Sequence, residues 1–332
     1  MGEFELIEQI FASTAQPEKA KPDVVLGIGD DCALLKPVPD MLMTISTDML
    51  VEGRHFLSTI SPERLGHKAL AVNLSDLAAM GATPKAFTLS LALPQADEAW
   101  CSRFAKGISA LAHEHDCQLI GGDTTRGPLC TISITVFGDI PSGQALLRSS
   151  AQVGDDIYIS HPVQSGIGDA RLVLEALRGQ PHLVGEYFDL ALERMECPQP
   201  RVALGQALRG VAHAAIDLSD GLLGDLEHIL KASGVGARVE VDNIPRSTLM
   251  HQQTVELQRL CTLAGGDDYE LIFTATPHQR AKVLAAAYQA DIAVTVIGKV
   301  ESNKGIRLLD ARGGFVANDF SSFDHFKEKS ST

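Results

Sequence analysis

The chain has 332 residues, of which 45% are apolar, so it can bury a core large enough for two domains of ordinary size. Acidic residues outnumber basic ones by 42 to 28, and the net charge of -14 argues against a nucleic-acid-binding surface. No apolar run approaches the ~18 residues of a membrane span, and the acidic start, MGEFELIEQIF, lacks the basic region of a signal peptide. We therefore expect a cytoplasmic protein that binds neither nucleic acid nor membranes, with its six cysteines reduced.

The first half of the chain predicts a mixture of helices and strands. In chain order we expect a helix over 4–11, strands over 24–29 and 41–50, a helix over 61–82, a strand over 86–94, a helix over 96–116, and strands over 117–125 and 130–140. The helix at 61–82 has the clearest signals. Ser61 is a suitable N-cap, Pro62 suits the first helical position, and Gly81 is a natural stop.

The second half predicts a new set of strands and helices after a segment rich in proline, glycine and serine at 138–156. We expect a strand over 156–160, two helical stretches on either side of the CPQP segment at 197–200, a strand over 214–218, a helix over 221–233, strands over 236–242 and 269–275, a helix over 277–289, and strands over 293–298 and 305–310. Neither half shows a regular β-α-β alternation. We therefore predict the α+β class, with two α+β domains at 1–145 and 146–332, and not a Rossmann or barrel fold.

Acidic residues recur beside glycines or other small residues in six segments. These segments contain Asp30 and Asp31; Asp48; Asp76; Asp123; Asp217 and Asp220; and Asp267, Asp268 and Glu270. Five of the six follow an apolar, strand-like stretch, and only the segment with Asp76 lies inside a predicted helix. One such segment alone is more typical of a turn or a helix cap. Six together favour carboxylates that converge and need cations to offset their repulsion.

The chemistry of these ligands favours Mg²⁺ or Ca²⁺ over zinc, because they offer only oxygen atoms. Mg²⁺ takes one or two carboxylates and leaves its other positions to water and substrate phosphates, so several ions would need several aspartates. The neighbouring glycines would let backbone N–H groups approach a polyphosphate closely. Because the chain contains no P-loop, protein-kinase or dinucleotide-binding motif, we expect phosphoryl transfer or hydrolysis on an uncommon ATP-binding fold.

Six motifs resemble those of the bacterial thiamine-monophosphate kinase family, which belongs to the aminoimidazole ribonucleotide synthetase-like ATP-binding superfamily. They are GIGDDCALL, ISTDMLVEGRHF, KALAVNLSDLAAMGATP, LIGGDTTRG, AIDLSDGLLGDLEHI and GGDDYEL, and the resemblance runs over about residues 3–326. It implies an N-terminal domain that binds ATP and Mg²⁺ and forms a homodimer, and a C-terminal α+β domain that completes the nucleotide and substrate site. The implied reaction is ATP-dependent phosphorylation of thiamine monophosphate to thiamine diphosphate, assisted by several Mg²⁺ ions.

The resemblance also implies roles for individual residues, carried over motif by motif. The Mg²⁺ ligands would be Asp31, Ser46, Thr47, Asp48, Asp76, Asp123, Asp217 and Asp220, of which Asp48, Asp76 and Asp220 would be catalytic. ATP would contact Gly122, Asp123, Arg148 and Ser219, and thiamine monophosphate would contact His55, Asp267 and Phe323. Ordinary alternatives stay open for three of them: an exposed surface arginine for Arg148, a turn histidine for His55, and core packing for Phe323.

Three departures from the family pattern concern the substrate contacts and leave the metal set intact. Asp267 stands where the family commonly has Glu, and Phe323 stands where a hydroxylated aromatic residue is common. The segment SHPVQSGIGDARL, residues 160–172, replaces a Gly-Asp-Ser turn and is about one residue longer. Its Gly166, Gly168 and Asp169 receive no assignment.

The expected mechanism is direct in-line transfer without a phospho-enzyme. The acceptor would be a phosphate oxygen that is already anionic at neutral pH, since its second pKa is about 6, so no strong general base is needed. One alternative is another member of the superfamily that phosphorylates or ATP-activates a formylglycinamidine ribonucleotide or selenide. A second alternative, from a different class, is a non-catalytic sensor of nucleotide or metal.

Overall fold

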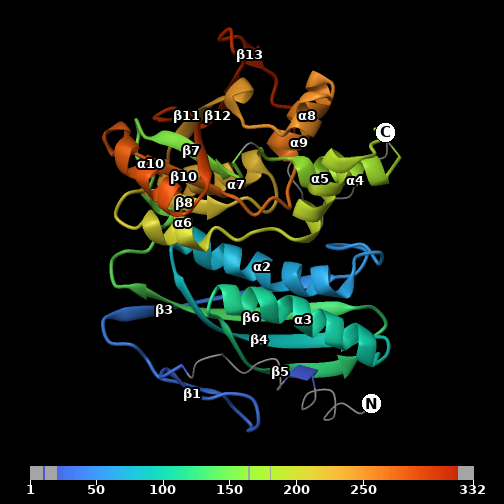
Figure 1. The fold of residues 1–332 in the computed structure, drawn as a ribbon. Helices are drawn as coiled ribbons and strands as arrows, with labels where there is room; N and C mark the ends of the chain where they lie inside the picture. The colour runs from blue at the N-terminus through green and yellow to red at the C-terminus, as the bar shows by residue number, and fades with distance from the viewer. Residues whose placement is uncertain (1–9, 12–20, 164, 180, 321–332) are drawn as a thin grey trace. The chain divides into compact units, whose positions relative to one another are not determined.

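The computed structural model describes residues 10–11, 21–163, 165–179 and 181–320 (Figure 1). The chain forms two compact units, the first from Met1–Ala145 and Glu196–Gln206, the second from Leu146–Met195 and Ala207–Thr332. Residues 196–206 thus belong to the first unit although they follow part of the second unit in the chain, which the sequence does not indicate. Most of the helix expected over 4–11 lies outside the described residues. The structure describes only Ile10 and Phe11 of it, and both are buried.

The first unit contains a four-stranded sheet with the strand order β3-β6-β4-β5. Its strands are β3 (Met41–Val51), β4 (Thr83–Leu93), β5 (Gln118–Arg126) and β6 (Thr131–Pro141). The β4 and β5 strands are parallel, and the other neighbours are antiparallel. A separate antiparallel pair, β1 (Val24–Leu26) and β2 (Leu34–Leu35), precedes this sheet in the chain.

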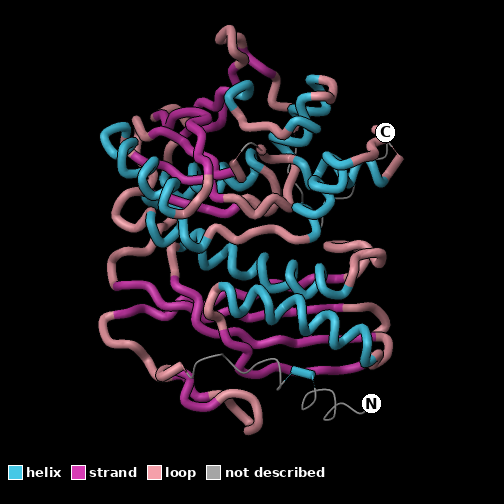
Figure 2. The backbone as a smooth tube through the Cα atoms, viewed as in Figure 1, coloured by secondary structure: helices cyan, strands magenta, loops and turns pink. Residues whose placement is uncertain are grey.

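Two long helices, α2 (Pro62–Met80) and α3 (Glu98–Glu114), cover one face of this sheet (Figures 1 and 2). The signals expected for α2 are confirmed. The Ser61 side chain accepts a hydrogen bond from the Arg64 N–H, proline follows it, and Gly81 ends the helix with a left-handed φ of 73°. The two helices approach so closely that a Cβ on Gly107 would lie 1.9 Å from the Glu63 carbonyl oxygen.

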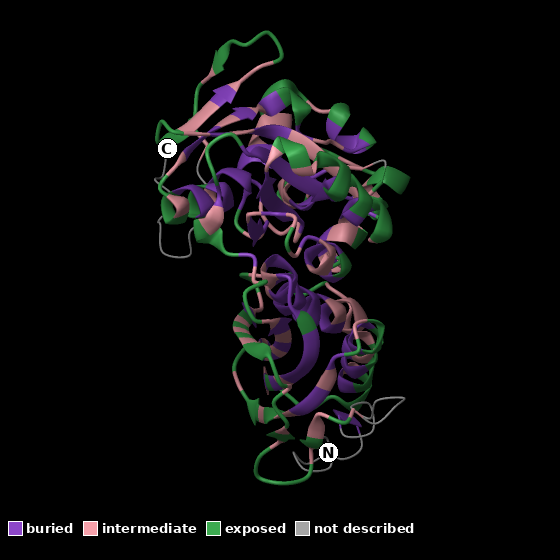
Figure 3. Ribbon diagram, turned by 90° about the vertical axis from the view of Figure 1, so that its left-hand side faces the viewer, coloured by how far each residue is buried: buried purple, intermediate pink, exposed green. Residues whose placement is uncertain are grey.

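Successive side chains of β3 point alternately to the helix-covered face of the sheet and to the opposite face, so more and less exposed residues alternate along the strand (Figure 3). Leu50 is buried, whereas Met43, Ile45 and Met49 are 43%, 61% and 56% exposed. Since successive side chains of a strand point to opposite faces, the odd-numbered residues of β3 form an apolar row on the face away from α2 and α3.

The second unit contains a seven-stranded sheet with the order β13-β12-β9-β11-β7-β10-β8. The strands are β7 (Asp156–His161), β8 (Ala214–Asp217), β9 (Gly236–Glu240), β10 (Leu271–Ala275), β11 (Ala293–Glu301), β12 (Gly305–Leu309) and β13 (Phe315–Val316). All neighbours are antiparallel except β12 and β9. With helices and mixed sheets in both units, the predicted α+β class is confirmed.

The helices of the later part of the chain include two that the sequence analysis does not predict. The α-helices are α4 (Asp169–Leu177), α5 (Glu186–Glu196), α6 (Val202–Ala207), α7 (Leu222–Ser233), α8 (Thr248–His251), α9 (Val255–Ala264) and α10 (Arg280–Gln289), and short 3-10 turns lie at Arg148–Ser150, Val241–Asn243 and Pro277–Gln279. The unpredicted helices are α8 and α9, which begin at the N-caps Ser247 and Thr254. In the described part of the chain, no helix is both long and apolar enough to cross a membrane.

Candidate active site

Three of the expected metal ligands meet where β3 lies against α2. Ser46 on β3 donates its hydroxyl hydrogen to Oδ2 of Asp76 on α2. Two residues along β3, the backbone N–H of Asp48 donates to Oδ1 of Asn73 at 3.1 Å. Asn73 is oriented in turn by a hydrogen bond from its Nδ2 to the Ala69 carbonyl oxygen at 3.0 Å. Ser46, Asp48 and Asp76 are therefore on the helix-covered side of β3.

Thr47 and Asp123 belong to the opposite face of the same sheet. Thr47 Oγ1 lies 2.8 Å from Thr135 Oγ1. Asp123 of β5 is opposite Ser90 of β4. Ser90 is opposite Ser133 of β6, which in turn is opposite Met49, an odd-numbered residue of β3. Residues directly opposite in neighbouring strands share a face, so Asp123 lies on the side of Thr47. The expected ligands that belong to this sheet are thus divided between its two faces, with Ser46 and Asp48 on one and Thr47 and Asp123 on the other.

Three positions of the predicted acids need correction. Asp48 and Asp123 lie inside β3 and β5 and do not follow them, because both strands continue for three more residues. Asp267 follows the helix α9 and precedes β10, so its segment does not come after a strand. Glycine and acid at these positions therefore occur within regular structure as well as in turns.

Asp31 and Gly122 lie in segments where the backbone conformation is demanding. The turn after β1 includes Gly29 with a φ of 125°, and the Asp31 N–H donates to Oδ1 of Asp30 at 2.9 Å. Asp30 therefore stabilises the turn, while the Asp31 side chain is exposed. At position 122 the neighbouring strand β4 leaves no room for a side chain, because a Cβ on Gly122 would lie 1.8 Å from the Leu89 carbonyl oxygen.

His55 closes the turn that follows β3. Its ring Nδ1 accepts a hydrogen bond from the Val51 N–H at 3.0 Å, and the backbone N–H of His55 donates to the Val51 carbonyl oxygen at 3.0 Å. An Nδ1 that accepts places the proton of the neutral imidazole on Nε2. The structure therefore shows the turn role left open by the sequence, with Nε2 as the donor atom.

In the second unit, two segments that carry expected site residues are joined through their backbones. The Asp267 N–H donates to the Ser219 carbonyl oxygen at 2.8 Å, and the Tyr269 N–H donates to that of Leu218 at 2.8 Å. Asp267 and Tyr269 both have left-handed φ values, 72° and 52°, which are uncommon for residues other than glycine. Asp217, the last residue of β8, is only 4% exposed.

The divergent segment at 160–172 is hydrogen-bonded to Asp268, the neighbour of Asp267. The guanidinium of Arg194 donates to Asp169 Oδ2 at 2.7 Å and to the Gly166 carbonyl oxygen at 2.6 Å. The Gly168 N–H donates to both carboxylate oxygens of Asp268, at 3.0 and 2.9 Å. Burial raises the pKa of Asp268 well above its usual range, against the opposing charge of Arg194. Gly166, Gly168 and Asp169, unassigned from sequence, therefore form one structural unit with Asp268.

The remaining expected contacts are less enclosed. Arg148 is exposed at the start of the 3-10 turn at Arg148–Ser150, and its carbonyl oxygen accepts a hydrogen bond from the Ser233 hydroxyl at 2.8 Å. Ser219 is half-buried and Asp220 is exposed. Phe323 lies outside the described residues.

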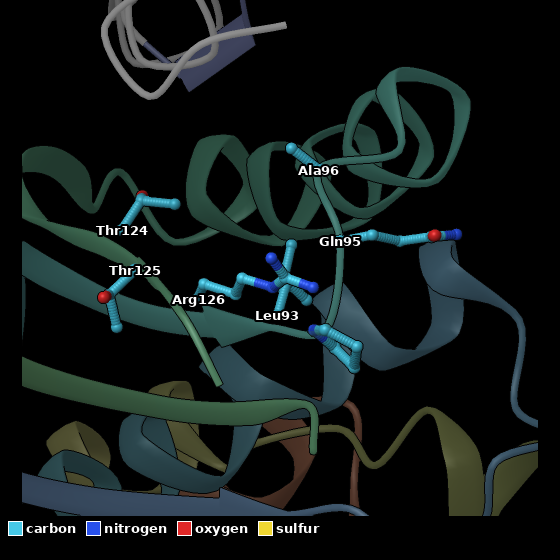
Figure 4. A pocket seen from close by; sticks show the side chains of 7 residues that line it. Leu93, Gln95, Ala96, Thr124, Thr125 and Arg126 are labelled. Carbon is cyan, nitrogen blue, oxygen red and sulfur yellow. The ribbon is translucent and has the colours of Figure 1, made fainter. Parts of the chain in front are cut away.

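A hollow of about 460 Å³ lies at the end of β4 and β5 in the first unit (Figure 4). It is lined by Leu93, Pro94, Gln95, Ala96, Thr124, Thr125 and Arg126. Three of these residues directly follow Asp123 in β5. The hollow therefore adjoins, along β5, two of the four residues expected to contact ATP, Gly122 and Asp123.

The donor set in the first unit is compatible with Mg²⁺. Within the described ranges, no group of three or more His, Cys, Asp or Glu side chains forms a metal cage. Mg²⁺ does not require one, because it usually keeps several waters and binds one or two carboxylates plus substrate phosphates. The contact between the Ser46 hydroxyl and the Asp76 carboxylate places two hard oxygen donors together. Ser46, Asp48 and Asp76 would hold such an ion.

Comparison with known proteins identifies the family. Residues 29–140 match the AIR synthase related protein N-terminal domain, and residues 152–310 match the AIR synthase related protein C-terminal domain. These two matches cover most of the chain. The chain therefore belongs to the AIR synthase related proteins.

Full-length relatives place it more narrowly. The chain is 44% identical over 328 residues to the thiamine-monophosphate kinase of Salmonella typhimurium and 43% identical over 327 residues to that of Escherichia coli K12, with 98% of each chain covered in both cases. The crystal structure of thiamine-monophosphate kinase from Stenotrophomonas maltophilia superposes with a TM-score of 0.82 at 44% identity, covering 93% of this chain and 96% of that one. A complex of AaThiL with AMPPCP and TMP superposes with a TM-score of 0.75 at 26% identity, covering 98% and 97%. Within the AIR synthase related proteins, the chain belongs to the thiamine-monophosphate kinase family.

Proposed function

We propose that the protein transfers the γ-phosphate of ATP to thiamine monophosphate and releases thiamine diphosphate and ADP. The observation that carries this proposal is the 44% identity to a thiamine-monophosphate kinase over 98% of both chains. The oxygen-rich pair formed by Ser46 and Asp76 supports it, because phosphoryl transfer depends on positioning and charge neutralisation more than on covalent catalysis.

In the proposed mechanism a phosphate oxygen of thiamine monophosphate attacks the γ-phosphorus in line. Mg²⁺, when bound, would neutralise the phosphate charges that otherwise repel the two anions. Asp48, Asp76 and Asp220 are the proposed catalytic carboxylates, and the ligand set is completed by Asp31, Ser46, Thr47, Asp123 and Asp217. Gly122, Asp123, Arg148 and Ser219 are proposed to bind ATP, and His55, Asp267 and Phe323 to bind thiamine monophosphate.

The acceptor oxygen is anionic at neutral pH, since its second pKa is about 6, so the chain does not need to supply a strong base. His55 fits a binding role, because its Nδ1 is occupied by the Val51 N–H and its Nε2 carries a proton that can be donated to a phosphate oxygen. We propose a cytoplasmic location, which agrees with six free cysteines.

We also propose that two copies associate through the first unit. The odd-numbered side chains of β3 present Met43, Ile45 and Met49 to solvent on the face away from α2 and α3. Such a row of large apolar side chains is typical of a surface covered by a partner. Sedimentation of wild type and of Ile45→Lys tests this: the wild type should be a dimer and the variant a monomer, with Val163→Lys, at a side chain 59% exposed in the second unit, as the control.

The activity is tested by ADP release with Mg·ATP and thiamine monophosphate, a formylglycinamidine ribonucleotide or selenide as acceptor. Rapid ADP formation is expected only with thiamine monophosphate. ADP formation with another acceptor would assign the protein to a different reaction of the superfamily. Calorimetric binding of Mg·ATP without turnover on any acceptor would favour a nucleotide sensor.

A further inference from the structure

The carboxylate of Asp225 lies inside the second unit and holds three consecutive backbone groups. Its side chain belongs to the first turns of α7, and the residue is only 3% exposed. The single oxygen Oδ2 accepts hydrogen bonds from the N–H groups of Ser219 at 3.1 Å, Asp220 at 3.1 Å and Gly221 at 3.0 Å. These residues precede α7, so the carboxylate points back out of the helix into the segment before it.

This arrangement differs from an ordinary helix cap. A capping side chain lies at the N-cap and accepts a hydrogen bond from a helical N–H two or three residues later. Here the N-cap is Gly221, which has no side chain to offer, and the donors lie at and before the cap. The carboxylate therefore fixes the path of residues 219–221 as well as the start of α7.

The tight path of this segment also requires its glycine. Gly221 has a φ of 125°, and a Cβ there would lie 3.0 Å from the Ala264 carbonyl carbon. On its other edge the segment is bound to residues 267–270. The Ser219 carbonyl oxygen accepts from the Asp267 N–H at 2.8 Å, and the Leu218 N–H donates to the Glu270 carbonyl oxygen at 2.7 Å. Asp225 therefore binds the N–H groups of residues 219–221, and the 267–270 segment binds the Leu218 N–H and the carbonyl oxygens of residues 218 and 219.

Two side chains to which the proposed reaction assigns a role project from this fixed segment: Ser219 and Asp220. We propose that Asp225 is a positioning residue for the phosphoryl transfer, which sets the directions of these two side chains by binding the backbone between β8 and α7. Asp225 contacts neither substrate nor metal in this role. The inference rests on the proposed kinase activity and adds to it a residue to which the family motifs assign no role here.

The test compares Asp225→Ala and Asp225→Asn with a matched control, Asp155→Asn. Asp155 is also buried in the second unit, at 2% exposure, and also accepts from a backbone N–H, that of Gln152 at 3.0 Å. Three quantities are measured: amide hydrogen exchange of the peptide containing residues 218–221, calorimetric affinity for Mg²⁺ with a non-hydrolysable ATP analogue, and kcat with thiamine monophosphate.

In Asp225→Ala we expect faster exchange at residues 219–221, about tenfold weaker binding of the Mg²⁺ complex, and a kcat lower by about 10²-fold, as for a displaced catalytic group. Asp225→Asn should lie between this variant and wild type, because its amide oxygen still accepts hydrogen bonds but carries no charge. If the alanine variant does not unfold cooperatively, the asparagine variant provides the test. The control should stay within about twofold of wild type in binding and kcat, since its partners, the Gln152 N–H and the His213 ring, both lie outside the 219–221 segment.

Unchanged exchange at 219–221 in the Asp225 variants would overturn the proposal, because the segment would then be held without this carboxylate. Faster exchange with unchanged binding and kcat would also overturn it, as would equal losses in the Asp155 control. Failure of the proposed function is distinct: wild type would then form no ADP with thiamine monophosphate. In that case the exchange and binding measurements still decide whether Asp225 positions a nucleotide site.

Discussion

The substitution Asp76→Asn tests the proposed catalytic role of the β3–α2 pair with little change in shape. Asparagine has nearly the same volume as aspartate, and its Oδ1 can still accept the hydrogen bond from the Ser46 hydroxyl. Asp and Asn have similar helix propensities, and Asp76 lies inside α2, away from its caps. The free energy of unfolding should therefore change by about 1 kcal/mol or less, the value of a typical single hydrogen bond.

The substitution removes one negative charge from the proposed metal ligands. Loss of a preorganised electrostatic group typically costs about 2.7–4 kcal/mol in transition-state stabilisation, so kcat should fall by roughly 10²–10³-fold. ADP release is measured at saturating ATP and thiamine monophosphate over a range of Mg²⁺ concentrations, and thermal unfolding is recorded on the same samples. A raised Mg²⁺ requirement with an unchanged Tm is the expected pattern.

The matched control is Asp97→Asn at the N-cap of α3. Asp97 is exposed and accepts from the Trp100 N–H at 2.9 Å, and asparagine is an equally good cap. This control should keep wild-type kcat and Tm. An Asp76→Asn variant that retains more than about a tenth of the wild-type rate would refute the catalytic assignment, since the loss would then be under ~1.4 kcal/mol.

Three further predictions concern stability. Gly107→Ala should lower the free energy of unfolding by about 1–3 kcal/mol or more in denaturant titrations, because its Cβ would lie 1.9 Å from the Glu63 carbonyl oxygen; an unchanged midpoint would contradict the close α2–α3 packing. Burial lowers the pKa of the His115 imidazole below 6.5, and its Nε2 has no hydrogen-bond partner among the described residues. The unfolded chain therefore binds a proton at His115 more tightly than the folded chain does, so the free energy of unfolding should fall as the pH drops below 6.5. His115→Gln should weaken that pH dependence of Tm, and an equal slope in both proteins would exclude His115 as its source. Lys85→Met should lower the free energy of unfolding by about 3 kcal/mol, because the ammonium of Lys85, which is 3% exposed, pairs with Asp139 at 2.9 Å and its loss leaves that carboxylate unpaired. Adding Asp139→Asn should recover part of this loss.

Several elements follow from local sequence signals and are present in the structure. The helix α2 has a serine cap, a proline in its first turn and a glycine stop, and each of these acts through the backbone of neighbouring residues only. The strands β3, β4 and β6 were likewise recognisable, because alternating polar and apolar residues reflect one buried face. Such signals do not depend on distant parts of the chain.

Other features depend on contacts that no local pattern records. The short helices α8 and α9 were not predicted, although Ser247 and Thr254 are good N-caps, because short helices owe their stability to packing more than to propensity. The return of residues 196–206 to the first unit also depends on tertiary packing: a Cβ on Gly205 would lie 2.0 Å from the Ala78 carbonyl oxygen of α2.

By itself the sequence determined the α+β class, the family motifs and the chemical type of the site, because residue identity fixes which atoms can bind Mg²⁺ and phosphate. It did not determine which side of a sheet each ligand occupies. Ser46 and Asp48 turn toward α2 while Thr47 and Asp123 lie on the opposite face, an outcome set by strand register, where a shift of one residue would reverse every side chain. The motif AIDLSDGLLGDLEHI does not indicate the proposed role of Asp225 either, since only the folded chain brings its carboxylate onto three backbone N–H groups of the preceding segment.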